Sequence, residues 1–131
     1  MRRWNGWGDA TKPYHLAGSA VQYLTHRLGQ LSPTPDANYQ EALLAVPESR
    51  LKHHPAVDCS AEARLAHARG QSLPDWIALR SGRIGCYPDG VIFPQSGEEV
   101  QELLRFARQN RIRLIPYGGG TSVVGHINPL P

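Results

Sequence analysis

Residues 116–125 of the chain read PYGGGTSVVG and directly follow the short apolar segment IRLI at residues 112–115. Three successive glycines can take positive φ angles, and they lack the Cβ atoms that would keep a ligand away from the backbone. Their amides can therefore point together at an anion, and neighbouring hydroxyl groups can add donors. The stretch predicts a loop that holds a diphosphate, although an exposed glycine turn would have the same composition. The candidate binding residues are Pro116, Tyr117, Gly118, Gly119, Gly120, Thr121, Ser122 and Val123.

Two other phosphate-binding loops do not fit this stretch. A Walker loop ends in Gly-Lys-Ser/Thr, which is absent here. The fingerprint G-x-G-x-x-G would need a glycine where the chain has Val123 or Ser122. The loop is also followed by glycine and prolines rather than by an amphipathic helix, so the amides must come from the turn itself.

The residues before the loop predict a β-α-β unit. A buried strand is expected at 89–94 and a second strand at 112–115. The helix between them should begin after Ser96, which has capping-box spacing to Glu99, and should stop at Asn110 in a left-handed conformation. The two strands should be parallel with a right-handed crossover, which places the loop at the carboxyl end of a strand. The fold class is therefore α/β (α+β). One apolar stripe of the helix comprises Val100, Leu103, Leu104 and Ala107.

The front half predicts short helices and turns rather than a flavin site. We divide the chain into a mostly helical accessory region at 1–82 and a binding domain that begins at 83 and runs to 131. Trp4 and Trp7 either hold the N-terminal segment on the body of the protein or a partner subunit, or pack in the core. The expected helices cover 17–28, 38–44, 61–69 (capped by Ser60 and ended by Gly70) and 73–80 (capped by Ser72 and Asp75, with Leu73, Trp76, Ile77 and Leu79 inward).

These motifs together resemble a known family. The pattern of Pro-Asp, strand, helix, strand and Pro-x-Gly-Gly-Gly-Thr-Ser over residues 88–125 resembles the first part of the FAD-binding (PCMH-type) domain of the vanillyl-alcohol oxidase family. Three further motifs are similar, in the same order, to the alkyldihydroxyacetonephosphate synthases of that family. They are RWNGWGD at 3–9, AHARG at 66–70 and LRSG at 79–82, whereas residues 11–54 match poorly.

The resemblance implies non-covalent FAD with its diphosphate on residues 116–123. Relatives that attach flavin through this loop carry histidine after the paired glycines, where this chain has Thr121; His126 does not match that position and either lies near the cofactor or faces water. The resemblance also implies a transferase that exchanges an acyl chain for a fatty alcohol in ether-lipid synthesis. The alternatives are an FAD-linked oxidase or dehydrogenase of a 2-hydroxy acid, and a non-catalytic truncated remnant.

The length of the chain adds an expectation about its completeness. The family's second FAD subdomain, cap domain and catalytic residues have no counterpart within 131 residues, so we expect an N-terminal fragment whose partner is the remainder of the same enzyme. The full-length parent is expected to be an enzyme and to form a homodimer, whereas this chain alone is expected to be inactive. No catalytic residue is assigned.

Composition and the remaining reactive residues narrow the function classes. A net charge of +3 without a basic run argues against nucleic-acid binding, and no apolar stretch reaches the roughly 20 residues of a membrane span. A cytoplasmic location is expected. Cys59 and Cys86 are expected to be reduced, and His53, His54 and Cys59 lack the spacing of a zinc site. Arg80 lies either near the cofactor or at the end of its helix.

Overall fold

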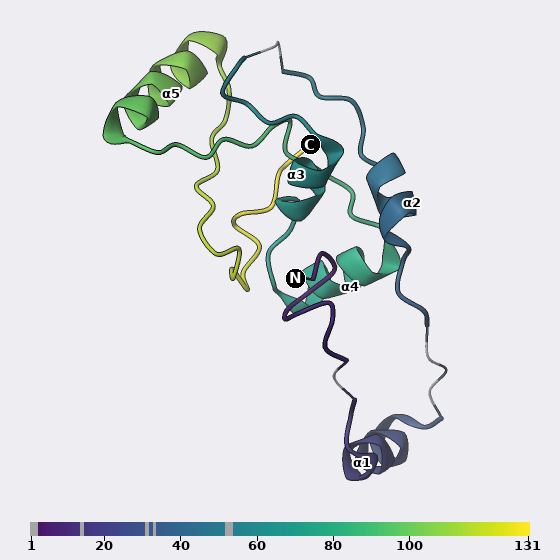
Figure 1. Cartoon of the computed structure of the whole chain (residues 1–131). Helices are drawn as coiled ribbons and strands as arrows, with labels where there is room; N and C mark the ends of the chain where they lie inside the picture. Colours follow the sequence, from purple (N-terminus) through teal and green to yellow (C-terminus); the bar gives the residue numbers. More distant parts are fainter. Residues whose placement is uncertain (1–2, 14, 31, 33, 52–53) are drawn as a thin grey trace.

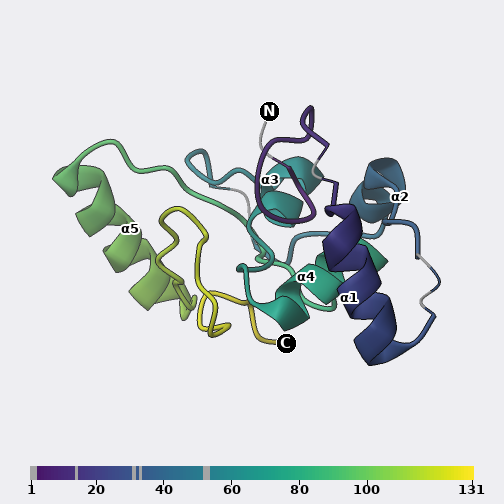
Figure 2. The same cartoon turned by 90° about the horizontal axis from the view of Figure 1, so that it is seen from below.

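The computed structural model describes residues 3–13, 15–30, 32, 34–51 and 54–131, and it contains helices connected by long irregular segments. In Figure 1, α2, α3 and α4 lie together in the centre, α1 projects from one side and α5 lies at the opposite end. Both views place the segment 112–131 between α5 and the α3–α4 pair (Figure 2). The helices are α1 (Gly18–Leu28), α2 (Tyr39–Leu44), α3 (Ala61–Ala66), α4 (Leu73–Ser81) and α5 (Gly97–Asn110).

Local capping signals explain where α3 and α4 begin. The Ser60 hydroxyl accepts the Ala63 amide at the start of α3. At the start of α4, Ser72 and Asp75 form the predicted capping box, so two backbone donors that lack helical partners are satisfied. The structure confirms these starts, but α3 ends at Ala66 rather than at residue 69. The chain is therefore already irregular where it runs past the glycine loop.

The hydrophobic core lies between α2, α3 and α4. Its buried members come from these three helices and from the segments that follow α3 and α4, and Trp4 packs against them from the N-terminal segment. The Trp4 and Tyr39 rings lie 5.7 Å apart. Core packing is therefore the correct reading for Trp4. The buried apolar residues of this cluster are Ala42, Leu65, Ala68, Leu79 and Ile84.

The expected inward face of α4 is partly wrong. Leu79 is buried and Trp76 is half-buried, but Leu73 and Ile77 are 71% and 61% exposed. The helix instead turns the face of Asp75 and Leu79 inward, because the Asp75 carboxylate is held in hydrogen bonds beneath it.

Helix α5 confirms its predicted extent and start. Ser96 accepts the Glu99 amide, and the Glu99 carboxylate accepts the amide of Gln95. The left-handed stop is Arg111 (φ 54°) rather than the expected Asn110. Of the apolar stripe only Ala107 is buried, whereas Leu104 is 55% exposed.

The two expected strands do not form a sheet in the described residues. Residues 89–94 and 112–115 are irregular, and the one recorded bridge is an antiparallel pair between Asp58 and Val91. The expected parallel pairing is thus absent from this structure. The physical reason is that a strand gains its stability from neighbouring strands and a covered face, and the side chains of Phe93, Leu114 and Ile115 remain 58%, 41% and 39% exposed.

Candidate functional site

The glycine loop follows residues 112–115 as predicted, but its glycines differ in conformation. Gly120 has φ 68° and is buried, and Gly125 at the end of the loop has φ 75°. Gly118 and Gly119 have no positive φ, so their role does not depend on left-handed backbone. A Cβ atom at Gly118 would meet nothing within 4 Å, which leaves open space beside the backbone.

The loop is fixed to the segment that follows α3. The Gln71 amide donates to the Ser122 carbonyl over 2.7 Å. At Gly70, a Cβ atom would lie only 2.5 Å from the same carbonyl oxygen. Glycine at position 70 therefore allows a close approach that no other residue permits.

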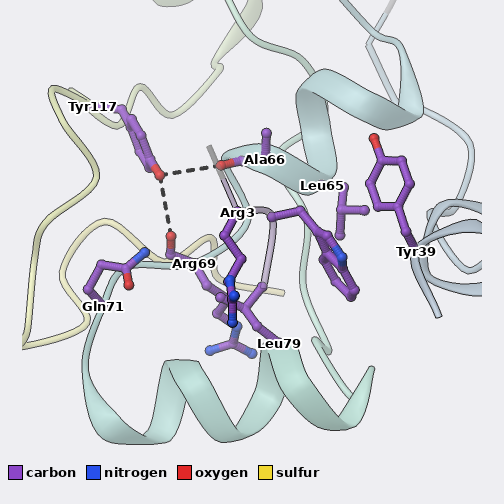
Figure 3. Close-up of a pocket in the computed structure, with 9 residues that line it drawn as sticks. Arg3, Tyr39, Leu65, Ala66, Arg69, Gln71, Leu79 and Tyr117 are labelled. Atoms are coloured by element: carbon purple, nitrogen blue, oxygen red, sulfur yellow. Dashed lines mark hydrogen bonds between the residues drawn. The ribbon is translucent and has the colours of Figure 1, made fainter. Parts of the chain in front are cut away.

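Tyr117 forms a second attachment, at the start of the loop. Its hydroxyl lies 3.4 Å from the carbonyl oxygens of both Ala66 and Arg69, which share its single proton (Figure 3). The His67 ring packs against it with centroids 4.7 Å apart, and His67 is itself oriented by a 2.7 Å hydrogen bond between Nδ1 and the Ala63 carbonyl. The aromatic residue before the glycines is thereby held on the end of α3.

A third attachment holds the chain just after the loop. The side chain of Asn128 accepts the Gly70 amide over 3.0 Å and donates to Asp75 over 2.7 Å. The Asp75 carboxylate is 1% exposed, also accepts the Ser72 hydroxyl, and lies 3.7 Å from the Arg69 guanidinium. A buried carboxylate with several donors and a cation is well satisfied, so this group fixes the position of the returning chain.

Two cavities border the loop, and both share Gln71. The larger, about 180 Å³, lies between the N-terminal segment, the ends of α3 and α4, and Tyr117; Figure 3 shows Arg3 and Arg69 both pointing toward its lower part. The smaller, about 130 Å³, lies between residues 6–8 and the glycine loop at Gly119 and Thr121. The sequence did not predict that the N-terminal motif and the glycine loop face one another.

The loop residues fit the diphosphate of the FAD that the resemblance implies. The Ser122 hydroxyl is buried without a hydrogen-bond partner among the described residues, which is costly unless an acceptor completes it. Thr121 is exposed beside the smaller cavity and offers a second hydroxyl. Residues 116–125 carry no charged side chain, so backbone and hydroxyl donors would hold the phosphates, with Arg3 and Arg69 the cations that line the larger cavity.

Other residues singled out from the sequence do not line either of these two cavities. Arg80 bonds Asp36 at 3.3 Å and lies 6.0 Å from the Trp76 ring centre. These contacts agree with the expectation that Arg80 lies at the end of its helix rather than near the cofactor. Val123 and His126 are exposed. Cys59 and Cys86 are free thiols. Among the described residues there is no group of three metal-ligating side chains, and the expectation at His53 lies outside them. No helix in the described part of the chain is long and apolar enough to cross a membrane.

Asp89, which opens the first expected strand, is held by Arg50. The guanidinium donates to both carboxylate oxygens, at 2.9 Å for each of its two shortest bonds. These bonds lower the pKa of Asp89 below its ordinary value, and burial opposes them only partly. Arg50 thereby fixes the chain that leads to α5.

Comparison with known proteins relates this chain to FAD-binding proteins. Residues 88–128 match the family described as FAD binding domain. The chain is 31% identical to an alkyldihydroxyacetonephosphate synthase of Trypanosoma brucei brucei over 114 residues, which are 78% of this chain and 18% of that protein. It is 46% identical to a mitochondrial D-lactate dehydrogenase [cytochrome] of Arabidopsis thaliana over 39 residues, 30% of this chain and 7% of that protein.

A solved structure extends the likeness to the whole chain. A structure of alkyldihydroxyacetonephosphate synthase superposes with a TM-score of 0.78 and 27% identity, covering 99% of this chain and 30% of that one. The fold is thus that of the N-terminal part of an FAD-binding protein, as expected from the sequence. The chain spans between 11% and 26% of the length of the curated synthases that it matches.

Proposed function

We propose that this chain holds the FAD diphosphate of a synthase-type transferase. Two findings support the proposal: residues 88–128 match the FAD binding domain family, and the chain is similar to alkyldihydroxyacetonephosphate synthases over most of its length. The binding loop is residues 116–123, and the cofactor is held without a covalent bond. The reaction exchanges the acyl chain of an acyl-dihydroxyacetone phosphate for a fatty alcohol and has no net oxidation. The proposed location is the cytoplasm.

The transferase is supported by the large share of the chain over which it is similar to the synthases. Synthase relatives match 78% of the chain by sequence and 99% by structure, so the likeness includes the N-terminal motif and α2 to α4. D-lactate dehydrogenases match about a third of the chain or less. A likeness that includes the segments packed against the glycine loop favours the synthase over a protein that shares the FAD-binding segment alone.

The residues of this chain have a binding role in this proposal. Gly118 leaves the backbone open to phosphate oxygens, and the hydroxyls of Thr121 and Ser122 donate to them. FAD, when bound, supplies a flavin ring that can accept and return electrons. Thr121 stands where covalent relatives have histidine, so nothing at this position can bond the flavin ring.

A second candidate keeps the cofactor and changes the reaction. Similarity to four D-lactate dehydrogenases, at 38–46% identity over 39–43 residues, favours oxidation of a 2-hydroxy acid, in which the flavin passes electrons onward. The two candidates differ in substrate. The transferase incorporates labelled fatty alcohol into an ether lipid without an electron acceptor, whereas the dehydrogenase reduces a dye with D-lactate.

The binding role is tested by replacing one loop glycine. Gly120→Val forces a branched side chain onto a buried residue with φ 68°, so we expect loss of bound FAD in equilibrium dialysis. Gly97→Ala is the matched control, because a Cβ atom there meets nothing within 4 Å. Unchanged FAD binding by the Gly120 variant would contradict the assignment of the loop.

A further inference from the structure

The N-terminal motif forms a closed loop rather than a free tail. The Arg3 amide donates to the Gly8 carbonyl over 3.0 Å, which closes residues 3–8 into a turn. Gly6 and Gly8 have φ angles of 153° and 96°, values that favour glycine at both positions. The conformation of Trp7, which lies between these glycines, is therefore set by the turn.

This loop is also fixed to the body of the protein. Asn5 is 6% exposed, and its side-chain amide donates to Asp36 over 2.9 Å. Asp36 in turn accepts from Arg80 on α4 over 3.3 Å. The neighbouring Trp4 is partly buried and packs against the hydrophobic core. The buried Asn5 and the partly buried Trp4 thus hold the loop in place, whereas Trp7 is exposed.

Trp7 has no place in the core, although the loop around it is well held. It is 57% exposed, whereas burial of an aromatic side chain of this size would stabilise the fold by about 2 kcal/mol or more. It lines the smaller cavity from one side, and Gly119 and Thr121 of the glycine loop line it from the other. A large flat ring that is left uncovered on a fixed turn, beside a phosphate-binding loop, is suited to stacking on a planar ligand.

We propose that residues 6–8 form the second wall of the FAD site and that Trp7 stacks on a planar ring of the bound dinucleotide. This inference rests on the proposed function, because it takes the glycine loop as the diphosphate site. Adenine and flavin rings both lie within a short chain of the diphosphate, and either would present the same flat aromatic face to the indole. The chemistry recognised is therefore a heteroaromatic ring attached to phosphate.

The first test measures FAD affinity of the purified chain by equilibrium dialysis. Stacking of a base on an aromatic side chain contributes about 1–3 kcal/mol, so Trp7→Leu, which keeps apolar bulk, should weaken binding by about tenfold. Trp7→Phe should stay within about threefold of the original affinity. Tyr23→Ala is the matched control, since Tyr23 is 62% exposed and lies on α1, no residue of which lines either cavity. Equal weakening by the leucine and phenylalanine variants, or none by leucine, would overturn the proposal.

The second test identifies the ring and separates this inference from the proposed function. Titration with ADP and with FMN should show the leucine effect for only the ligand whose ring meets Trp7. If neither ligand nor FAD is affected while Gly120→Val abolishes FAD binding, the stacking proposal fails and the loop assignment stands. If the unmodified chain binds no FAD, or Gly120→Val retains it, the proposed function fails and this inference fails with it.

Discussion

Substitution of Gly70 by alanine tests how closely the glycine loop depends on the segment that follows α3. The added Cβ atom would lie 2.5 Å from the Ser122 carbonyl oxygen and 3.2 Å from a carboxylate oxygen of Asp75, whereas ordinary contacts begin at 3.4 Å. Gly70 has no positive φ, so the effect is steric rather than a matter of backbone conformation. Relief of the overlap requires the loop to move by about 0.9 Å, which weakens the 2.7 Å hydrogen bond from Gln71.

The expected magnitude follows from two contributions. Overpacking in a well-packed site costs about 1–3 kcal/mol, and loss of one hydrogen bond costs about 0.5–1.5 kcal/mol. We therefore expect the free energy of unfolding to fall by about 2–4 kcal/mol and FAD to bind at least tenfold more weakly, by urea titration and by dialysis. Gly97→Ala, in open space at the start of α5, should be neutral or slightly stabilising. A Gly70→Ala protein within about 0.5 kcal/mol of the original, with unchanged FAD affinity, would refute the reasoning.

Three further predictions concern neighbouring groups. Asn128→Ala leaves the buried Asp75 carboxylate without one of its donors, so urea titration should show a loss of about 1–3 kcal/mol; an unchanged midpoint would contradict this role. The pKa of Asp89 is lowered in the folded state, so its ion pair with Arg50 stabilises the fold at pH values above the ordinary carboxyl pKa near 3.8, and this stabilisation is lost as the pH falls through the lower folded pKa. Asp89→Asn should therefore reduce the dependence of the unfolding free energy on pH in this acidic range. An identical pH dependence in the variant would argue against the pair. Because Thr121 cannot bond the flavin, acid precipitation of the FAD-loaded protein should leave all flavin in the supernatant, and flavin in the washed pellet would show a covalent link.

Sequence reasoning located the helices because their ends are set by local hydrogen bonds. Ser72 with Asp75, and Ser96 with the amide of Glu99, are contacts within one turn, and each is present in the structure. It placed the stop of α5 one residue early, because asparagine and the following arginine can both take a left-handed conformation and only the surrounding chain decides between them. The apolar period of α4 was a poorer guide, since a buried carboxylate, not the most apolar face, turns toward the body of the protein.

The expected strands failed for a different reason. Alternating and branched apolar residues predict an extended chain, but pairing depends on residues far away in the sequence. The bridge between Asp58 and Val91 joins residues whose pairing no local pattern indicates. Strand propensity alone could therefore predict extended segments at 89–94 and 112–115 but not their partners.

The assignment of the glycine loop as the ligand-facing part of the site stays a prediction, and the sequence carries no signal for the residues that hold this loop in place. Three glycines before two hydroxyl residues indicate a phosphate loop, because the function requires those residue types in succession. Gly70 and Asn128 carry no such signal, as their roles arise from contacts across more than 50 residues of chain. The motif AHARG at residues 66–70 supports the family resemblance, and it also contains Gly70, on which the glycine loop packs.

These contacts change the meaning of the front half of the chain. The sequence predicts an accessory region there rather than a flavin site, and the structure adds that the carbonyls of Ala66 and Arg69 and the amide of Gln71 all bond the glycine loop. A loop of three glycines has much conformational freedom to lose when it binds a ligand, and attachment at both ends and at Ser122 removes part of that cost before binding. If α3 and α4 serve to pre-organise the loop, their loss should weaken FAD binding even though neither helix contains a proposed binding residue. This dependence gives a physical reason for the synthase likeness to extend over the whole chain, because the loop and the helices that hold it can change only together.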